Sequence, residues 1–149
     1  MVYIFARPTI TSCLESLLLI FSGLALRFWA AGYIGNDARS KTISAQRIIT
    51  NGPYRYFRHP LYLGNFAIVA GMLVALKPPL TIALLIILGF ILMYGLIARS
   101  ETRFLEGSDL EIAAAHFSLQ KAISEWQTWL VTALALILTF AKALFLSQR

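Results

Sequence analysis

The sequence predicts an all-α integral membrane protein, a polytopic bundle of about four transmembrane helices in one domain covering residues 1–149. Composition is the first reason, because 58% of the residues are hydrophobic, whereas soluble domains contain about 45–50%. The second reason is that this excess lies in four charge-free segments, residues 17–26, 61–76, 80–98 and 126–141. The third is Lys77-Pro78-Pro79, whose prolines end one helix, start the next and so predict a helical hairpin.

The first helix is predicted to cover roughly residues 9–34 and to be retained in the mature protein. The basic start contains only Arg7 and is interrupted by Pro8, and Arg27 follows the apolar run, which is not the pattern of a cleaved signal peptide. Residues 80–98 supply the roughly 20 residues that a span requires. The other segments reach that length if the Lys and Arg side chains at their ends extend to the headgroups.

Core helices of a soluble protein are the alternative for the second and third segments. Neither segment has the polar face that a surface helix shows, so the membrane interpretation is preferred.

Lys and Arg residues are distributed unequally between the two ends of the predicted bundle. Nine lie in or beside the loops after the first and third helices, and four lie at the other end: Arg27, Arg39, Lys41, Arg47, Arg55, Arg58, Arg99, Arg103 and Lys121 against Arg7, Lys77, Lys142 and Arg149. The positive-inside rule therefore predicts that both loops are cytoplasmic and both termini outside. The expected location is a bacterial inner membrane, whose anionic lipids suit the net charge of +6. Nucleic acid is not an expected partner, because the basic residues flank membrane helices.

The stretch NGPYRYFRHPLYLGN, residues 51–65, places cations and rings directly before the second span. Pro60 suits the first turn of a helix, whose free amide groups and positive dipole end would point at the cytoplasmic surface. Arg55, Arg58 and His59 stand beside that end, so the stretch predicts a site for a small anion, a carboxylate or a phosphate. In the alternative explanation, the arginines bind lipid phosphate and the prolines only punctuate the chain.

Gly64, Asn65 and Glu101 extend this predicted site. Gly64 permits close approach of a ligand or another backbone, and Asn65 should face protein because polar groups within a membrane avoid lipid. Glu101 falls on one helical stripe with Tyr94 at the end of the third span. Because the hairpin places that end beside the start of the second span, Glu101 is expected to approach the cations. A pocket with cationic and acidic walls would suit a zwitterion; the alternatives are a plain ion pair of Glu101 with Arg58 and a purely packing Gly64.

The segment GPYRYFRHPLYLGN resembles the signature of the isoprenylcysteine carboxyl methyltransferase-like family, which is related to the phospholipid N-methyltransferases. The family motif, approximately Arg-His-Pro-any-Tyr-any-Gly, is complete from Arg58 to Gly64. GLALRFWAAGYIG, residues 23–35, is similar to the first span of the family, and SEWQTWL, residues 124–130, to the closing span of one bacterial branch.

The chain departs from the family pattern after the third span. A second family motif begins with two glutamates, of which this chain keeps Glu101 and has Thr102 in the second position. The tail usual in the family is replaced by a shorter loop, in which residues 111–123 predict a short amphipathic helix lying on the membrane.

The resemblance implies a membrane-embedded, S-adenosylmethionine-dependent methyltransferase that acts at the cytoplasmic membrane face on a lipophilic acceptor, a carboxylate or an amine. The expected partners are membrane lipid and a lipophilic small molecule or prenylated substrate. The implied catalytic residues are Arg58 and Glu101, and the implied cofactor-binding residues are His59, Pro60, Tyr62, Gly64, Asn65 and Glu101. No metal site is expected, because Cys13 is the single cysteine and His59 and His116 are the only histidines.

Two other functions remain open at this stage. In the first alternative, the protein is a catalytically degenerate relative that binds a lipid or a partner protein. In the second, it is a nicotinamide-dependent membrane lipid reductase, and its basic rim holds the phosphates of the cofactor. Oligomers are also open, because the pairs Gly64 with Gly71 and Gly89 with Gly95 would suit helix packing between protomers.

Overall fold

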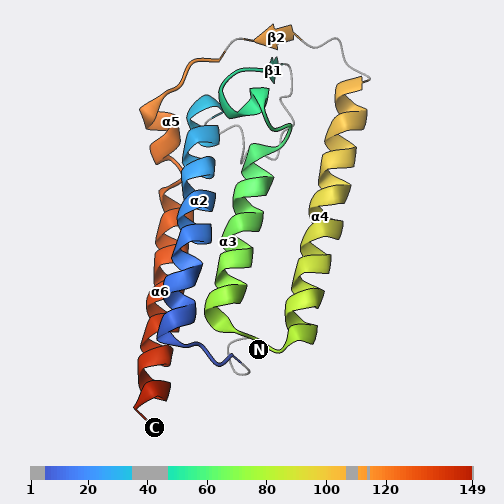
Figure 1. Cartoon of the computed structure of the whole chain (residues 1–149). Helices are drawn as coiled ribbons and strands as arrows, with labels where there is room; N and C mark the ends of the chain where they lie inside the picture. Colours follow the sequence, from blue (N-terminus) through green and yellow to red (C-terminus); the bar gives the residue numbers. More distant parts are fainter. Residues whose placement is uncertain (1–5, 35–46, 107–110, 114, 149) are drawn as a thin grey trace.

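The computed structural model describes residues 6–34, 47–106, 111–113 and 115–148; the side chains of residues 47–48, 98, 101–106 and 111–113 lie outside that description. It confirms the all-α bundle (Figure 1). The elements in chain order are α2 (Ile10–Ile34), β1 (Arg47–Ile49), the 3-10 turn η2 (Gly52–Arg55), α3 (Pro60–Leu76), α4 (Leu80–Glu106), β2 (Glu111–Ala113), α5 (Leu119–Ile123) and α6 (Trp126–Ser147).

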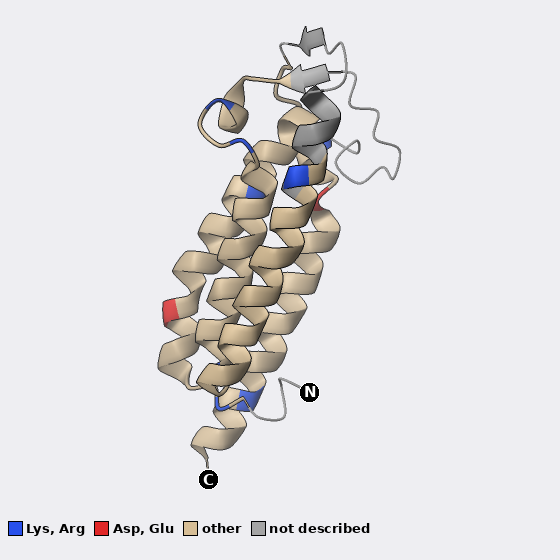
Figure 2. Cartoon of the chain, turned by 90° about the vertical axis from the view of Figure 1, so that its right-hand side faces the viewer, with Lys and Arg blue, Asp and Glu red and all other residues tan. Residues whose placement is uncertain are grey.

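Length and composition agree with a membrane protein. Within the described parts of the chain, three stretches are long and apolar enough to cross a bilayer, namely Ile10–Ile34, Leu80–Ile97 and Leu119–Ser147, and Pro60–Leu76 is a shorter apolar helix. Lys and Arg gather at the two ends of the bundle, and its length is almost free of charge (Figure 2). The predicted helical membrane bundle is therefore confirmed.

Helices α2 and α3 pack closely because glycines remove side chains from their interface. A Cβ added at Gly64 would lie 2.6 Å from Cγ of Arg27 and 2.9 Å from the carbonyl oxygen of Gly23. A Cβ at Gly71 would lie 2.5 Å from Cγ1 of Ile20. At the far end of the pair, Ser12 Oγ donates a buried hydrogen bond of 3.0 Å to the carbonyl of Ala75. The two backbones thus meet along most of the length of α3.

The predicted hairpin joins α3 to α4 as expected. Lys77 ends α3 in the left-handed conformation, with φ of 44°, and its amide donates to the carbonyl of Leu73 at 3.0 Å. Pro79 starts α4, since its carbonyl accepts from the amides of Ile82 and Ala83 at 2.9 and 3.1 Å. Beyond the hairpin turn, the other helices cover little of the surface of α4, and no residue of its Leu80–Ile97 stretch is buried inside the structure.

The loop segments meet at the end of the bundle opposite the hairpin. Strands β1 and β2 pair in parallel, with Arg47 beside Glu111 and Ile49 beside Ala113. Beyond β2, the amide of Ser118 donates to the carbonyl of Gly32 at 2.9 Å. The helix predicted for residues 111–123 is therefore shorter than expected. Its first part is held extended by strand pairing and by this bond to α2, and only α5 is helical.

Candidate functional site

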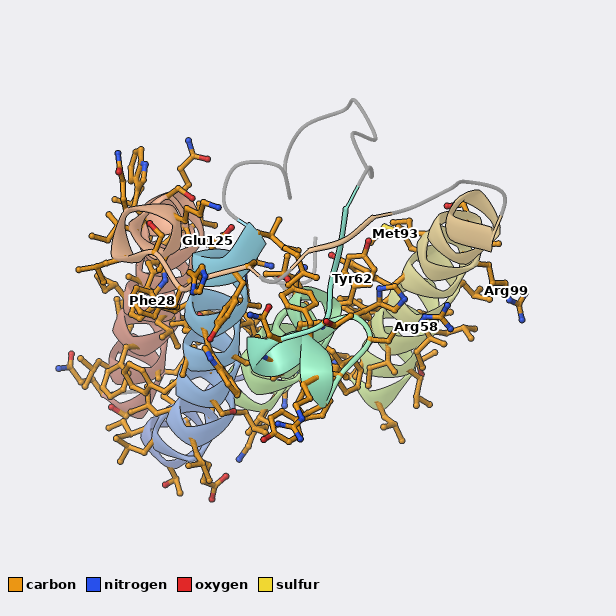
Figure 3. The ribbon with its side chains drawn as sticks, turned by 90° about the horizontal axis from the view of Figure 1, so that it is seen from above. Phe28, Arg58, Tyr62, Met93, Arg99 and Glu125 are labelled. Carbon is orange, nitrogen blue, oxygen red and sulfur yellow. The ribbon has the colours of Figure 1, made fainter. Side chains whose placement is uncertain are left out.

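A pocket of about 470 Å³ lies between α3 and α4, at the end of the bundle that carries the 51–65 stretch. Its lining combines a cation and an imidazole with aromatic and aliphatic side chains: Tyr56, Phe57, Arg58, His59, Tyr62, Leu63, Phe66, Phe90, Ile91 and Tyr94. Seen from above, Arg58 and Tyr62 extend from the α3 side toward α4, while Arg99 points away from the bundle (Figure 3). The pocket is thus polar at one end and apolar toward the membrane segments.

The residues before α3 are positioned by a tight turn. Gly52 has φ of 63°, and a Cβ there would lie 2.4 Å from the Tyr33 ring, so only glycine fits the position. Pro53 is buried behind it. His59 is the N-cap of α3, and its carbonyl accepts from the amides of Tyr62 and Leu63 at 3.1 and 3.2 Å. This turn fixes the point at which the imidazole enters the pocket.

Aromatic rings form a continuous wall from the mouth of the pocket into the membrane region. His59 stacks on Tyr62 with ring centroids 5.3 Å apart, and Tyr62 contacts Tyr94 at 4.7 Å. Phe90 stacks on Tyr94 at 4.2 Å and contacts Phe66 at 5.5 Å. Flat rings of this kind accept planar, apolar or cationic groups.

A buried polar chain runs behind this wall and touches all four long helices. The guanidinium of Arg27 on α2 forms an ion pair with Glu125, the residue directly before α6, and both side chains are buried. The same guanidinium donates to Oδ1 of Asn65 on α3. Nδ2 of Asn65 then bonds the hydroxyl of Tyr94 on α4 at 2.8 Å. Thr128 completes the chain by donating to Glu125 at 3.0 Å.

The structure brings some of the predicted site residues together. Arg58, His59 and Tyr62 all line the pocket. Pro60 and Gly64 are buried and do not line it, and Gly64 contacts α2. Asn65 lies behind the pocket, facing protein through Arg27 and Tyr94. The backbone of Glu101 is part of α4, but its side chain lies outside the described residues, so its approach to Arg58 and His59 stays a prediction.

Arg27 and Glu125 were not predicted from the sequence as site residues, and Tyr94 was predicted only to share a helical face with Glu101. One available signal was that a charged residue inside a membrane span rarely lacks a partner. Arg27 lies seven residues from the end of α2, and Glu125 stands immediately before an apolar helix. Their pairing across 98 positions of sequence is a tertiary contact.

Comparison with known proteins gives a family match and two curated relatives. The model of the phospholipid methyltransferase family matches residues 12–108. Nickel-cobalt-cadmium resistance protein NccN of Alcaligenes xylosoxydans xylosoxydans is 40% identical over 79 residues, 53% of this chain and 34% of the relative. Cobalt-zinc-cadmium resistance protein CzcN of Cupriavidus metallidurans is 36% identical over 87 residues, 58% of this chain and 37% of the relative.

The chain thus aligns with about a third of the length of each of these curated relatives. No solved structure matches it. The family match includes the Arg58–Gly64 motif, the α3–α4 hairpin and the whole lining of the pocket. Because that match covers more than half of the 149 residues, the chain belongs to the phospholipid methyltransferase family, a family of membrane methyltransferases.

Proposed function

We propose that the protein transfers a methyl group from S-adenosylmethionine to a lipophilic acceptor, a carboxylate or an amine, at the cytoplasmic face of the membrane. The observation that carries this proposal is the pocket between α3 and α4, which Arg58, His59 and Tyr62 of the motif line together with the aromatic rings of α4. Family membership supports the reaction type. The excess of Lys and Arg at the pocket end supports the orientation.

The residues of the pocket fit S-adenosylmethionine. A volume of about 470 Å³ falls within the range of about 300–1,000 Å³ typical of small-molecule sites. The guanidinium of Arg58 would pair with the carboxylate of the amino acid end, and His59 would stand beside it. The stack of His59 on Tyr62 offers a flat face to the adenine or the sulfonium. When bound, this cofactor supplies an electrophilic methyl group on its sulfonium.

The protein's own task is then to orient the acceptor and exclude water. Tyr94, Phe90 and Phe66 wall the apolar part of the pocket and would hold the acceptor in line with the methyl group. A carboxylate acceptor is ionised at neutral pH and needs no base. An amine acceptor needs removal of a proton, for which His59 and Glu101 are the proposed bases.

A lipophilic acceptor would enter from the side. Leu63 and Ile91 line the pocket, and their side chains are also exposed on the outer surface of α3 and α4. Since both helices are apolar along this region, the surface that they expose would face lipid. Membrane lipid and prenylated molecules are the proposed classes of acceptor.

Methyl transfer by the purified protein in detergent tests the proposal. We expect label from methyl-tritiated S-adenosylmethionine to enter the organic phase of a total bacterial lipid extract. His59→Ala should lower the rate at least tenfold because it removes a pocket side chain. The matched control is His116→Ala, an exposed histidine outside the pocket lining, whose rate should equal that of the wild type.

Thermal unfolding with added ligand distinguishes the methyltransferase from the two alternative functions, the reductase and the degenerate relative. S-adenosylhomocysteine should raise the melting temperature, and a nicotinamide dinucleotide should not. Stabilisation by the nicotinamide nucleotide alone would replace the proposal with the reductase. A protein that neither ligand stabilises and that transfers no label would be the degenerate relative.

A further inference from the structure

The buried polar chain forces the orientation of the Asn65 amide. Arginine side chains carry only hydrogen-bond donors, so the amide atom that faces Arg27 must be the oxygen. Glu125 holds the guanidinium from its other side through a charge-assisted bond. The amide nitrogen of Asn65 is therefore left to face the hydroxyl of Tyr94, 2.8 Å away.

This orientation determines what the hydroxyl of Tyr94 can do. An amide nitrogen only donates, so the Tyr94 oxygen is the acceptor in its bond with Asn65. Its own proton has no acceptor among the described side chains. Because Tyr94 lines the pocket, a bound molecule within reach of the hydroxyl could accept that proton. The chain of contacts thus leaves the Tyr94 hydroxyl able to act as a hydrogen-bond donor.

Tyr94 also stands where the pocket changes character. Its ring contacts Tyr62, which stacks on His59 at the polar end, and stacks on Phe90 at the apolar end. A ligand that filled both parts would place a lipophilic chain against Phe90 and its polar head beside Tyr94. The group beside Tyr94 must accept a hydrogen bond, which an oxygen does and an ammonium does not.

We propose that Tyr94 donates a hydrogen bond to an oxygen in the headgroup of the lipophilic acceptor, with Glu125, Arg27 and Asn65 as positioning residues. This inference rests on the proposed function and favours acceptors that carry an oxygen in the headgroup, carboxylates above all. Glu125 lies outside the residues that the family model matches. A residue of the C-terminal part of this chain would therefore orient the Tyr94 donor, through Arg27 and Asn65.

Binding of dodecanoate to the protein in nanodiscs tests the role of Tyr94. Tyr94→Phe removes the donor and keeps the ring, so dodecanoate should bind about tenfold more weakly, as expected for a hydrogen bond to a charged group. Dodecylamine has the same chain without an oxygen and should bind wild type and variant equally. Tyr33→Phe removes a hydroxyl outside the pocket lining and should change neither affinity.

Asn65→Asp tests the positioning residues. Aspartate still accepts from Arg27, but its second oxygen would take the Tyr94 proton and turn the donor away from the pocket. Dodecanoate binding should fall as far as in Tyr94→Phe. The double variant should be no weaker than either single variant, because both changes remove the same bond.

Several results would overturn the inference. These are unchanged dodecanoate binding in Tyr94→Phe, additive losses in the double variant, or equal losses for dodecanoate and dodecylamine. Weaker binding of S-adenosylhomocysteine in Tyr94→Phe, with dodecanoate unaffected, would assign the oxygen to the cofactor and also refute it. A wild type that binds dodecanoate as described but not S-adenosylhomocysteine would refute the proposed function and leave the donor role of Tyr94 intact.

Discussion

The two faces of α3 differ in how they meet their neighbours. Toward α2, glycines bring the backbones together, so a Cβ at Gly23 would lie 2.7 Å from the carbonyl oxygen of Gly64. Toward α4, the helices are joined by the hairpin, by aromatic rings and by the bond between Asn65 and Tyr94. Close packing on one face of α3 and a pocket on the other indicate that the α2–α3 interface forms the support, and that the facing side chains of α3 and α4 form the wall of the binding space.

This difference separates changes that should unfold the protein from changes that should affect binding. Support residues are buried or have no room for an added atom, and wall residues are at least partly exposed. The following variants test the distinction by unfolding in mixed micelles, in which sodium dodecyl sulfate is titrated against the folded protein.

Loss of the buried acid should have the largest effect. Glu125→Ala leaves the buried Arg27 guanidinium without its ionic partner, which costs about 3–5 kcal/mol of the free energy of unfolding. Glu15→Ala removes an exposed acid on α2 and should change that free energy by less than about 0.5 kcal/mol. Equal stability of the two variants would show that the ion pair contributes nothing to the support.

Filling the glycine contact should have the next largest effect. Gly64→Val places methyl groups where even a Cβ is only 2.6 Å from Arg27, so overpacking should cost about 1–3 kcal/mol. Gly95→Val makes the same change on α4, where an added Cβ meets nothing within 4 Å. If Gly95→Val destabilised the protein as much as Gly64→Val, the distinction between support and wall would be wrong.

A change within the aromatic wall should have the smallest effect on stability. Phe90→Leu removes the ring contacts with Tyr94 and Phe66, which are worth about 0.5–1.5 kcal/mol. Phe21→Leu alters an exposed ring on α2 and should have no measurable effect. If Phe90→Leu instead lowered the free energy of unfolding by several kcal/mol, α4 would belong to the support.

The sequence predicted the helices because their ends carry local signals. Pro60 begins α3 and Lys77-Pro78-Pro79 forms the hairpin turn, as backbone chemistry requires. Arg58, His59 and Tyr62 of the motif line one pocket because they are neighbours in sequence, and the hairpin supplies its second side from α4.

The buried polar chain and the strand pairing were not predicted, because neither has a local signal. In the sequence, Arg27 follows an apolar run, as a cation at the membrane surface also would. Its partner Glu125 is evident only in the structure, where α6 packs beside α2. Strands β1 and β2 are three residues each and come from different loops, so no periodicity distinguishes them. The strand at the start of residues 111–123 was not predicted, because three residues are too few to show alternation of polar and apolar side chains.

Equilibrium binding of radiolabelled S-adenosylhomocysteine tests most directly whether the pocket between α3 and α4 holds the methyl donor. Two arginines at the same end of the bundle give a matched pair, since Arg58 lines the pocket and Arg99 points away from it (Figure 3). We predict that Arg58→Ala lowers affinity at least tenfold and that Arg99→Ala binds as tightly as the wild type. Equal affinity of all three proteins, or equal losses in both variants, would contradict the account.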